Sequence, residues 1–159
     1  MSSRKWVPRV MVGAVLLALG VFGLVLYGAM SGVEAAAEAR VTLSMEARAN
    51  VLRLCGDAQS YRDEHGAFLS AGPVPAQVPR GRESVPFVPD ENMRKLGFDP
   101  GERVRCQYEV VVQETPLGEA EVTCFARGDQ DGDGQVSVFK VTLDANGMTS
   151  AVQVEREDE

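Results

Sequence analysis

An uncharged apolar run, residues 10–30, restricts the possible folds of this chain more than any other feature of its sequence. As a helix at about 1.5 Å per residue, a run of this length crosses a hydrocarbon core of roughly 30 Å. Three basic residues and no acid precede the run, and the first charged residue after it is Glu34. Because basic flanks stay in the cytoplasm, we predict a single-pass inner-membrane protein with a cytoplasmic N-terminus and a periplasmic or otherwise extracytoplasmic C-terminal domain.

The membrane segment divides the chain into three parts. We predict a basic leader over residues 1–9, a transmembrane helix over 10–30 and one extracytoplasmic domain over 31–159. A cleaved signal peptide is the alternative, because the alanines at 35–37 offer small residues for cleavage. The apolar run exceeds the about 7–15 apolar residues usual in a signal peptide, and this length favours the retained anchor.

Charge and composition exclude several functions. The chain has a formal net charge of −7 and a single histidine, His65. Its acidic domain lacks the clustered lysines and arginines that phosphate contacts need, so we expect no nucleic-acid partner. One histidine cannot build a multi-histidine metal centre, and no nucleophile lies beside a base in a recognisable pattern. We therefore predict that the protein is not an enzyme.

A helix is predicted over residues 31–65, directly after the membrane segment. Residues 33–65 contain no proline and one glycine, and they are rich in the strong helix formers Ala, Glu, Arg and Leu. Apolar residues spaced three and four apart form one continuous stripe in the second half of this helix. Its members are Val51, Leu54, Ala58 and Tyr61. Gly66 supplies the C-terminal stop.

In the rest of the domain, the sequence predicts a long loop followed by a sheet. Five of the eight prolines lie between Pro73 and Pro89, so residues 66–103 are expected to form a Pro-rich αβ-loop. A short helix over 91–96 is expected within it, with Asp90 as N-cap and Gly97 as C-terminal stop.

Alternating apolar residues predict antiparallel strands over residues 104–154, and an acidic tail at 155–159 is expected to be solvated. Two strand pairs are expected, and the second turns at 144–147. The fold class is therefore α+β, with a long N-terminal helix packed on a roughly four-stranded antiparallel sheet.

Three stretches of the sequence resemble type IV pilins and pseudopilins. Residues 58–68 (AQSYRDEHGAF) are similar to the end of the long pilin helix. Residues 96–101 (LGFDPG), followed by 106–108 (CQY), are similar to the start of the pilin sheet. Residues 126–134 (ARGDQDGDG) are similar to a GD-x-DGDG stretch found in some bacterial pilin-like proteins. The resemblance implies the pilin fold, in which a membrane-spanning helix continues into a helix that packs on an antiparallel sheet.

The same resemblance implies a structural or assembly protein of a type IV pilus or a type II secretion-like system. Its expected partners are pilin-like or secretion-system subunits, the lipid bilayer and further copies of itself. Prepilins have a leader that ends in Gly and a Glu at the fifth mature position. No Gly precedes the apolar run here and residues 10–30 contain no Glu, so we expect the N-terminus to be retained. A membrane-tethered binding or sensor module that does not polymerise is the alternative function.

A calcium site is predicted after the second strand. Asp129, Asp131 and Asp133 match the first three ligand positions of an EF-hand loop, and Gly134 matches its turn glycine. The last EF-hand ligand, a glutamate, is replaced by Lys140. The predicted structural Ca²⁺ has the candidate ligands Asp129, Asp131, Asp133, Gln135 and Ser137. The resemblance supports this prediction, because major pseudopilins hold a structural calcium in this region, whereas the alternative is a metal-free Asp/Gly turn.

Three cysteines outside the cytoplasm predict one disulfide and one remaining thiol. Cys106 and Cys124 lie on one face of neighbouring predicted strands, and they are directly opposite if the turn between them centres on Thr115. We therefore predict a disulfide between Cys106 and Cys124. Cys55 points toward the same core and could replace either partner, and three buried free thiols are the other alternative.

Overall fold

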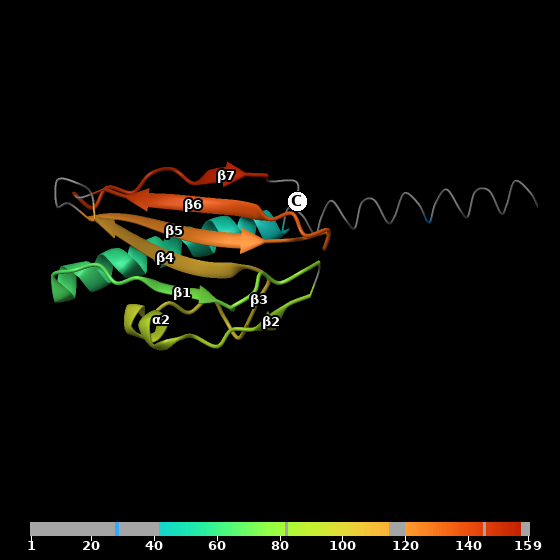
Figure 1. The fold of residues 1–159 in the computed structure, drawn as a ribbon, viewed down its shortest axis with the longest axis horizontal. Coiled ribbons are helices and arrows are strands. Elements are labelled where there is room, and N and C mark those ends of the chain that lie inside the picture. Colours follow the sequence, from blue (N-terminus) through green and yellow to red (C-terminus); the bar gives the residue numbers. More distant parts are fainter. Residues whose placement is uncertain (1–27, 29–41, 82, 115–119, 145, 157–159) are drawn as a thin grey trace, which may run out of the picture. The chain divides into compact units, whose positions relative to one another are not determined.

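The computed structural model describes residues 28, 42–81, 83–114, 120–144 and 146–156 (Figure 1). The chain divides into two units, residues 1–39 and 40–159, and every described residue except Gly28 belongs to the second. Among the helices of the described residues, none has the length and the apolar character needed to cross a bilayer. The predicted transmembrane segment lies outside the described residues, apart from Gly28.

The described part of the chain begins with a long helix, residues 42–65. Its residues spaced three, four and seven apart are buried, so one face is apolar and packed. The buried members of this face are Leu43, Ala47, Val51, Leu54, Cys55 and Ala58. The helix ends at Gly66, which has a φ of 80° and whose N–H donates to the Arg62 carbonyl at 2.7 Å. The predicted stop at Gly66 is confirmed, because this backbone conformation favours glycine.

The helix packs on a five-stranded antiparallel sheet of order β1-β4-β5-β6-β7. The strands are β1 (Ala71–Val74), β4 (Gln107–Glu114), β5 (Ala120–Gly128), β6 (Ser137–Leu143) and β7 (Gln153–Glu155). The predicted α+β class is confirmed, with five strands instead of about four. Figure 1 shows the long helix running behind β4, β5 and β6, so one face of the sheet is covered.

The expected Pro-rich loop contains more regular structure than predicted. β1 includes Pro73 and lies at the edge of the sheet, where a missing N–H costs no hydrogen bond to a neighbouring strand. β2 (Val85–Pro86) and β3 (Arg103–Val104) form a separate two-stranded sheet.

The predicted short helix is confirmed as α2 (Glu91–Leu96). Asp90 caps its start, where Oδ1 accepts a hydrogen bond from the Met93 N–H at 2.6 Å. Gly97 ends it at a φ of 75°.

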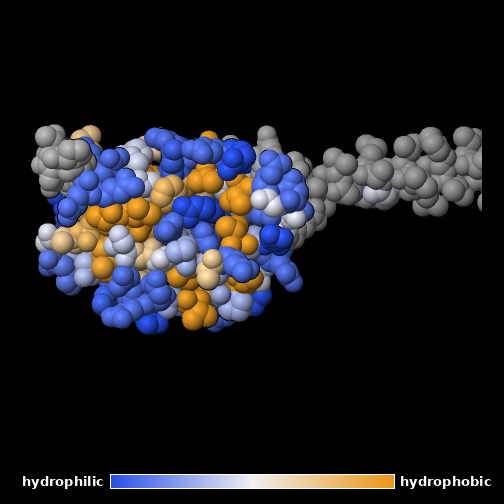
Figure 2. Space-filling model, viewed as in Figure 1, coloured by the Kyte–Doolittle hydropathy of each residue, from blue (hydrophilic) through white to orange (hydrophobic). Residues whose placement is uncertain are grey.

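The other face of the sheet carries ion pairs between neighbouring strands. Figure 2 views this face, where apolar and charged residues are mixed. Arg127 contacts Glu109 at 2.6 Å and lies over the Phe125 ring, 4.4 Å from its centroid. Lys140 contacts Glu155 at 2.9 Å. Glu155 is the last residue of β7, so the strand extends into the predicted acidic tail, although the Glu155 side chain is exposed as expected. The Arg127–Glu109 pair is half-buried, whereas the Lys140–Glu155 pair is more exposed, and an exposed pair contributes about 0–1 kcal/mol.

A disulfide joins the long helix to the sheet. Cys55 bonds to Cys124 with their Cα atoms 5.7 Å apart, and Cys106 is a buried free thiol. The predicted Cys106–Cys124 disulfide is therefore wrong. Cys124 lies opposite Val110, which follows Cys106 by four residues. At about 3.4 Å per residue, the two cysteines are separated by roughly 14 Å along the strands, beyond the Cα separation of about 7 Å that a disulfide tolerates.

Candidate metal centre

Three carboxylates gather in the loop between β5 and β6. Asp129, Asp131 and Asp133 each offer one oxygen, and these oxygens all lie within 4.8 Å of one another. Ca²⁺ binds oxygen at 2.3–2.6 Å, so two ligands on opposite sides of the ion are about 5 Å apart. The three oxygens therefore have the spacing that a single Ca²⁺ needs. Oxygen ligands without His or Cys also match the preference of a hard cation.

Backbone amides of the loop organise the carboxylates. Asp129 accepts hydrogen bonds from the Gly132 N–H at 2.8 Å and from the Gly134 N–H at 3.2 Å. Both glycines have positive φ, 82° and 96°, which lets the chain turn around the Asp129 side chain. Asp131 Oδ1 accepts from the Asp133 N–H at 3.1 Å. These contacts hold the side chains in the loop, and each carboxylate keeps lone pairs for a cation.

Asp133 is ordered by the residue that follows it by two positions. Its Oδ1 accepts the Gln135 N–H at 2.7 Å, and its Oδ2 accepts the Gln135 side-chain amide at 3.0 Å. Because these donors stabilise the charged form, they lower the pKa of the Asp133 carboxyl below its ordinary value. Asp133 is therefore ionised at neutral pH, as a calcium ligand must be.

Asp129 also connects the loop to the Pro-rich segment. The side chain is 2% exposed, and the backbone carbonyl accepts the Gly81 N–H at 2.6 Å. Arg80 forms a parallel β-bridge with Asp129. This contact is not predictable from the sequence, because nothing in the local pattern around Gly81 indicates a partner almost fifty residues away. The loop thus fastens two distant parts of the chain to each other.

The other predicted ligands lie in different positions. Gln135 is exposed and contacts Asp133 through its side chain. Ser137 is buried at the start of β6, where it pairs with Gly128 of β5. Lys140, at the position of the EF-hand glutamate, lies within β6 and contacts Glu155. The structure thus brings the three aspartates together with Gln135 at their edge, and the loop ends in a strand and not in an EF-hand helix.

Comparisons of the chain with protein-family models, with curated proteins and with solved structures find no match. The fold and the loop nevertheless define a class of domain. One long helix covers one face of a five-stranded antiparallel sheet, and a three-carboxylate loop connects two of the strands. The function must be inferred from these features and from the sequence.

Proposed function

We propose that this chain is a membrane-anchored, pilin-like structural or assembly protein of a type IV pilus or a type II secretion-like system. The observation that carries the proposal is the long helix, which follows the apolar run in sequence and buries one face against an antiparallel sheet. Such a helix can hold a folded domain outside the bilayer while the apolar run stays inside it. The partners of this function are pilin-like or secretion-system subunits and further copies of the chain.

The loop between β5 and β6, which carries the three aspartates, adds a structural Ca²⁺ to this proposal. Asp129, Asp131 and Asp133 would hold the ion, and their mutual repulsion would be relieved when it binds. The ion would also stabilise the contact of Asp129 with Gly81. Its role is structural, because it would fasten the β5–β6 connection to the Pro-rich segment.

Site-specific photo-crosslinking in cells tests the proposed assembly. A photo-reactive amino acid replaces Leu52, which lies on the outer face of the long helix and is 45% exposed. We expect a ladder of self-adducts or adducts to chains with an apolar N-terminal run followed by a helix. The matched control carries the same group at Arg94, an exposed residue of α2. Monomer alone at both positions would contradict the assembly function.

The alternative function, a membrane-tethered binding or sensor module, is favoured by the sequence of the apolar run, which contains no glutamate. It predicts a discrete adduct to one unrelated protein instead of a ladder. Both functions predict that the N-terminus is retained, and the intact mass of membrane-extracted protein tests this point. A product that begins within residues 10–40 would contradict the anchor in either case.

A further inference from the structure

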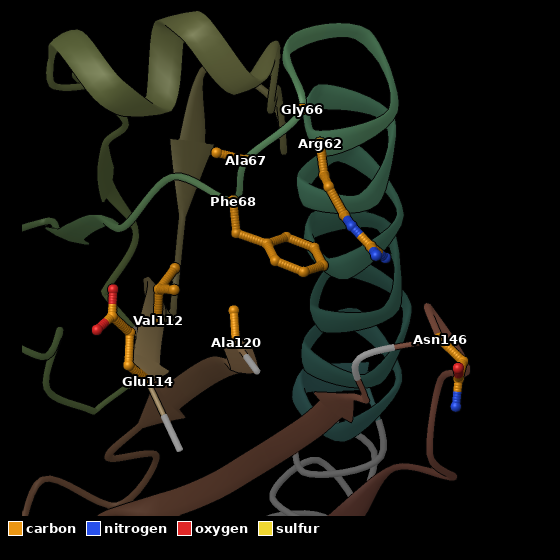
Figure 3. Close-up of a pocket in the computed structure, with 8 residues that line it drawn as sticks. All are labelled: Arg62, Gly66, Ala67, Phe68, Val112, Glu114, Ala120 and Asn146. Atoms are coloured by element: carbon orange, nitrogen blue, oxygen red, sulfur yellow. The ribbon is translucent and has the colours of Figure 1, made fainter. Parts of the chain in front are cut away.

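Asn146 lies in the connection between β6 and β7 and is exposed. Gly147 follows it, so no side chain shields the backbone nitrogen next to the Asn146 amide. Figure 3 shows Asn146 on this connection, with its side-chain amide directed away from the Phe68 ring. An exposed asparagine followed by glycine is the arrangement in which an asparagine side chain reacts most readily with its own backbone.

This reaction joins two atoms of neighbouring residues. The Gly147 nitrogen attacks Cγ of Asn146, the C–N bond of the side-chain amide breaks, and the amide nitrogen leaves as ammonia with the proton of the Gly147 N–H. The product is a cyclic succinimide. Water then opens the ring at one of its two carbonyls, and the residue becomes aspartate or isoaspartate, in which the main chain runs through Cγ. The reaction needs only water and no oxidant, reductant or cofactor.

The other two asparagines of the chain are held by their side chains and by helices. Asn50, in the long helix, donates from Nδ2 to the Tyr108 hydroxyl at 2.8 Å. Asn92, in α2, donates from Nδ2 to the Ser70 carbonyl at 2.8 Å. Each is followed by a residue with a buried side chain, whose backbone nitrogen is fixed by the helix. Asn146 is therefore the asparagine that the structure leaves open to this reaction.

Hydrogen bonds of the connection hold the Gly147 nitrogen away from Cγ. The Gly147 N–H donates to the Asp144 carbonyl at 2.9 Å. The Asp144 carboxylate accepts the Asn146 N–H at 3.0 Å and the Met148 N–H at 2.7 Å. The Gly147 nitrogen can attack only after its bond to Asp144 breaks. The rate of the reaction in the folded protein therefore depends on how often this local structure opens.

The same connection packs closely on the long helix. A Cβ added at Gly147 would lie 2.9 Å from Oε1 of Gln59, so no space remains between the two residues. Isoaspartate at position 146 would add a methylene group to the main chain directly before Gly147, together with a negative charge. Because the close contact cannot absorb this extra length, the connection would move away from Gln59.

We propose that Asn146 is a site of spontaneous deamidation, and that the hydrogen bonds accepted by Asp144 set its rate. Asp144 is a positioning residue, because it holds the backbone around the Gly147 nitrogen and takes no part in the bond changes. Isoaspartate at position 146 separates the β6–β7 connection from Gln59. The fraction of modified chains therefore rises with the time since synthesis.

The test is peptide mapping by mass spectrometry of full-length protein in phosphatidylcholine nanodiscs, incubated at mildly alkaline pH. We expect the mass change from amide to acid at Asn146 and none at Asn50 or Asn92, with isoaspartate identified by electron-transfer fragmentation. In guanidinium chloride the reaction at Asn146 should be at least about tenfold faster, because the local structure is open. No mass change at Asn146, or an equal rate at Asn92 in the native protein, would overturn the proposal.

Variants assign the rate to the hydrogen bonds of Asp144. Asp144→Ala removes the carboxylate, so the native protein should react about fivefold faster, whereas the rate in guanidinium chloride should stay that of the wild type. Thr149→Ala, a change at another exposed residue of the connection, is the matched control and should leave both rates unchanged. Asn146→Gln keeps an amide but would need a larger ring, so position 146 should stay unmodified. Equal native rates for the wild type and Asp144→Ala would overturn the role of Asp144.

Discussion

At the scale of single residues, the three aspartates of the β5–β6 loop differ in their burial and in the hydrogen bonds that their carboxylates accept. Asp129 is buried and organises the loop backbone, whereas Asp131 and Asp133 are exposed and each accept an amide two residues ahead. Asp131 therefore has the least structural role without metal. It is the residue whose replacement best separates metal binding from the folding of the loop.

We predict that millimolar calcium raises the melting temperature of the wild type above its value in EDTA. With a dissociation constant of about 10⁻⁴–10⁻³ M, 1 mM calcium stabilises the fold by roughly 0.4–1.4 kcal/mol, which corresponds to about one to a few degrees. Asp131→Ala should lose most of this shift. Asp144→Ala, which removes an aspartate from the β6–β7 turn, is the control and should keep it. Equal melting temperatures for the wild type in both buffers would identify the loop as a metal-free turn.

Cys106 should be unreactive while the protein is folded. Burial raises the pKa of its thiol to about 12, so almost none of the reactive thiolate is present at mildly alkaline pH. We expect no labelling by iodoacetamide in native conditions and one labelled thiol per chain in denaturant without reductant. Cys106→Ser should reduce the second value to zero. More than one labelled thiol in denaturant would contradict the Cys55–Cys124 bond.

At the scale of elements, the two faces of the long helix are expected to contribute differently to the free energy of unfolding. Leu54 is fully buried, whereas Leu52 is 45% exposed. Leu54→Ala should therefore lower the free energy of unfolding by about 2–5 kcal/mol, and Leu52→Ala should change it by about 0.5 kcal/mol or less. Urea unfolding of the full chain, followed by circular dichroism, measures both values. Equal losses would mean that the helix does not bury this face.

The elements that could be predicted from sequence are those with local signals. Gly66 ends the long helix, and Asp90 with Gly97 bounds α2, because each signal lies within one turn of the boundary that it sets. β1 is not predicted because its proline, Pro73, argues against a strand, and only the edge position of β1 makes this proline tolerable. The three aspartates of the candidate site share one loop and were predictable for the same local reason.

The contacts that could not be predicted are those set by register or by distant segments. The register of the β4–β5 pairing places Cys124 opposite Val110 and not opposite Cys106. Because Cys106 is therefore too far along the strand, Cys124 forms its disulfide with Cys55. The contact of Asp129 with Gly81 depends in the same way on how the Pro-rich segment returns to the sheet. Local patterns do not determine such long-range pairings.

At the scale of the whole molecule, the Cys55–Cys124 bond closes a loop across a sequence separation of 69 residues. The chain-entropy model assigns such a loop about 4 kcal/mol of stabilisation. We expect the Cys55→Ala/Cys124→Ala variant to lose about 2–5 kcal/mol of unfolding free energy and to become insensitive to reductant. Cys106→Ala is the control, and its stability should still fall when dithiothreitol is added. A wild type whose stability is the same with and without dithiothreitol would contradict this role.

The same bond governs how the domain would respond to tension. A pull applied between the N-terminal helix and the C-terminus passes from Cys55 directly to Cys124, so the chain between them carries no load. The segment between the two cysteines has a contour length of about 240 Å, at about 3.3–3.6 Å per extended residue, and the disulfide prevents this length from extending. An oxidised molecule can therefore lengthen only through the residues outside the loop. Reduction of the disulfide would allow the segment between Cys55 and Cys124 to extend. The redox state of this one bond therefore determines whether the domain behaves as a short tether or as a long extensible one.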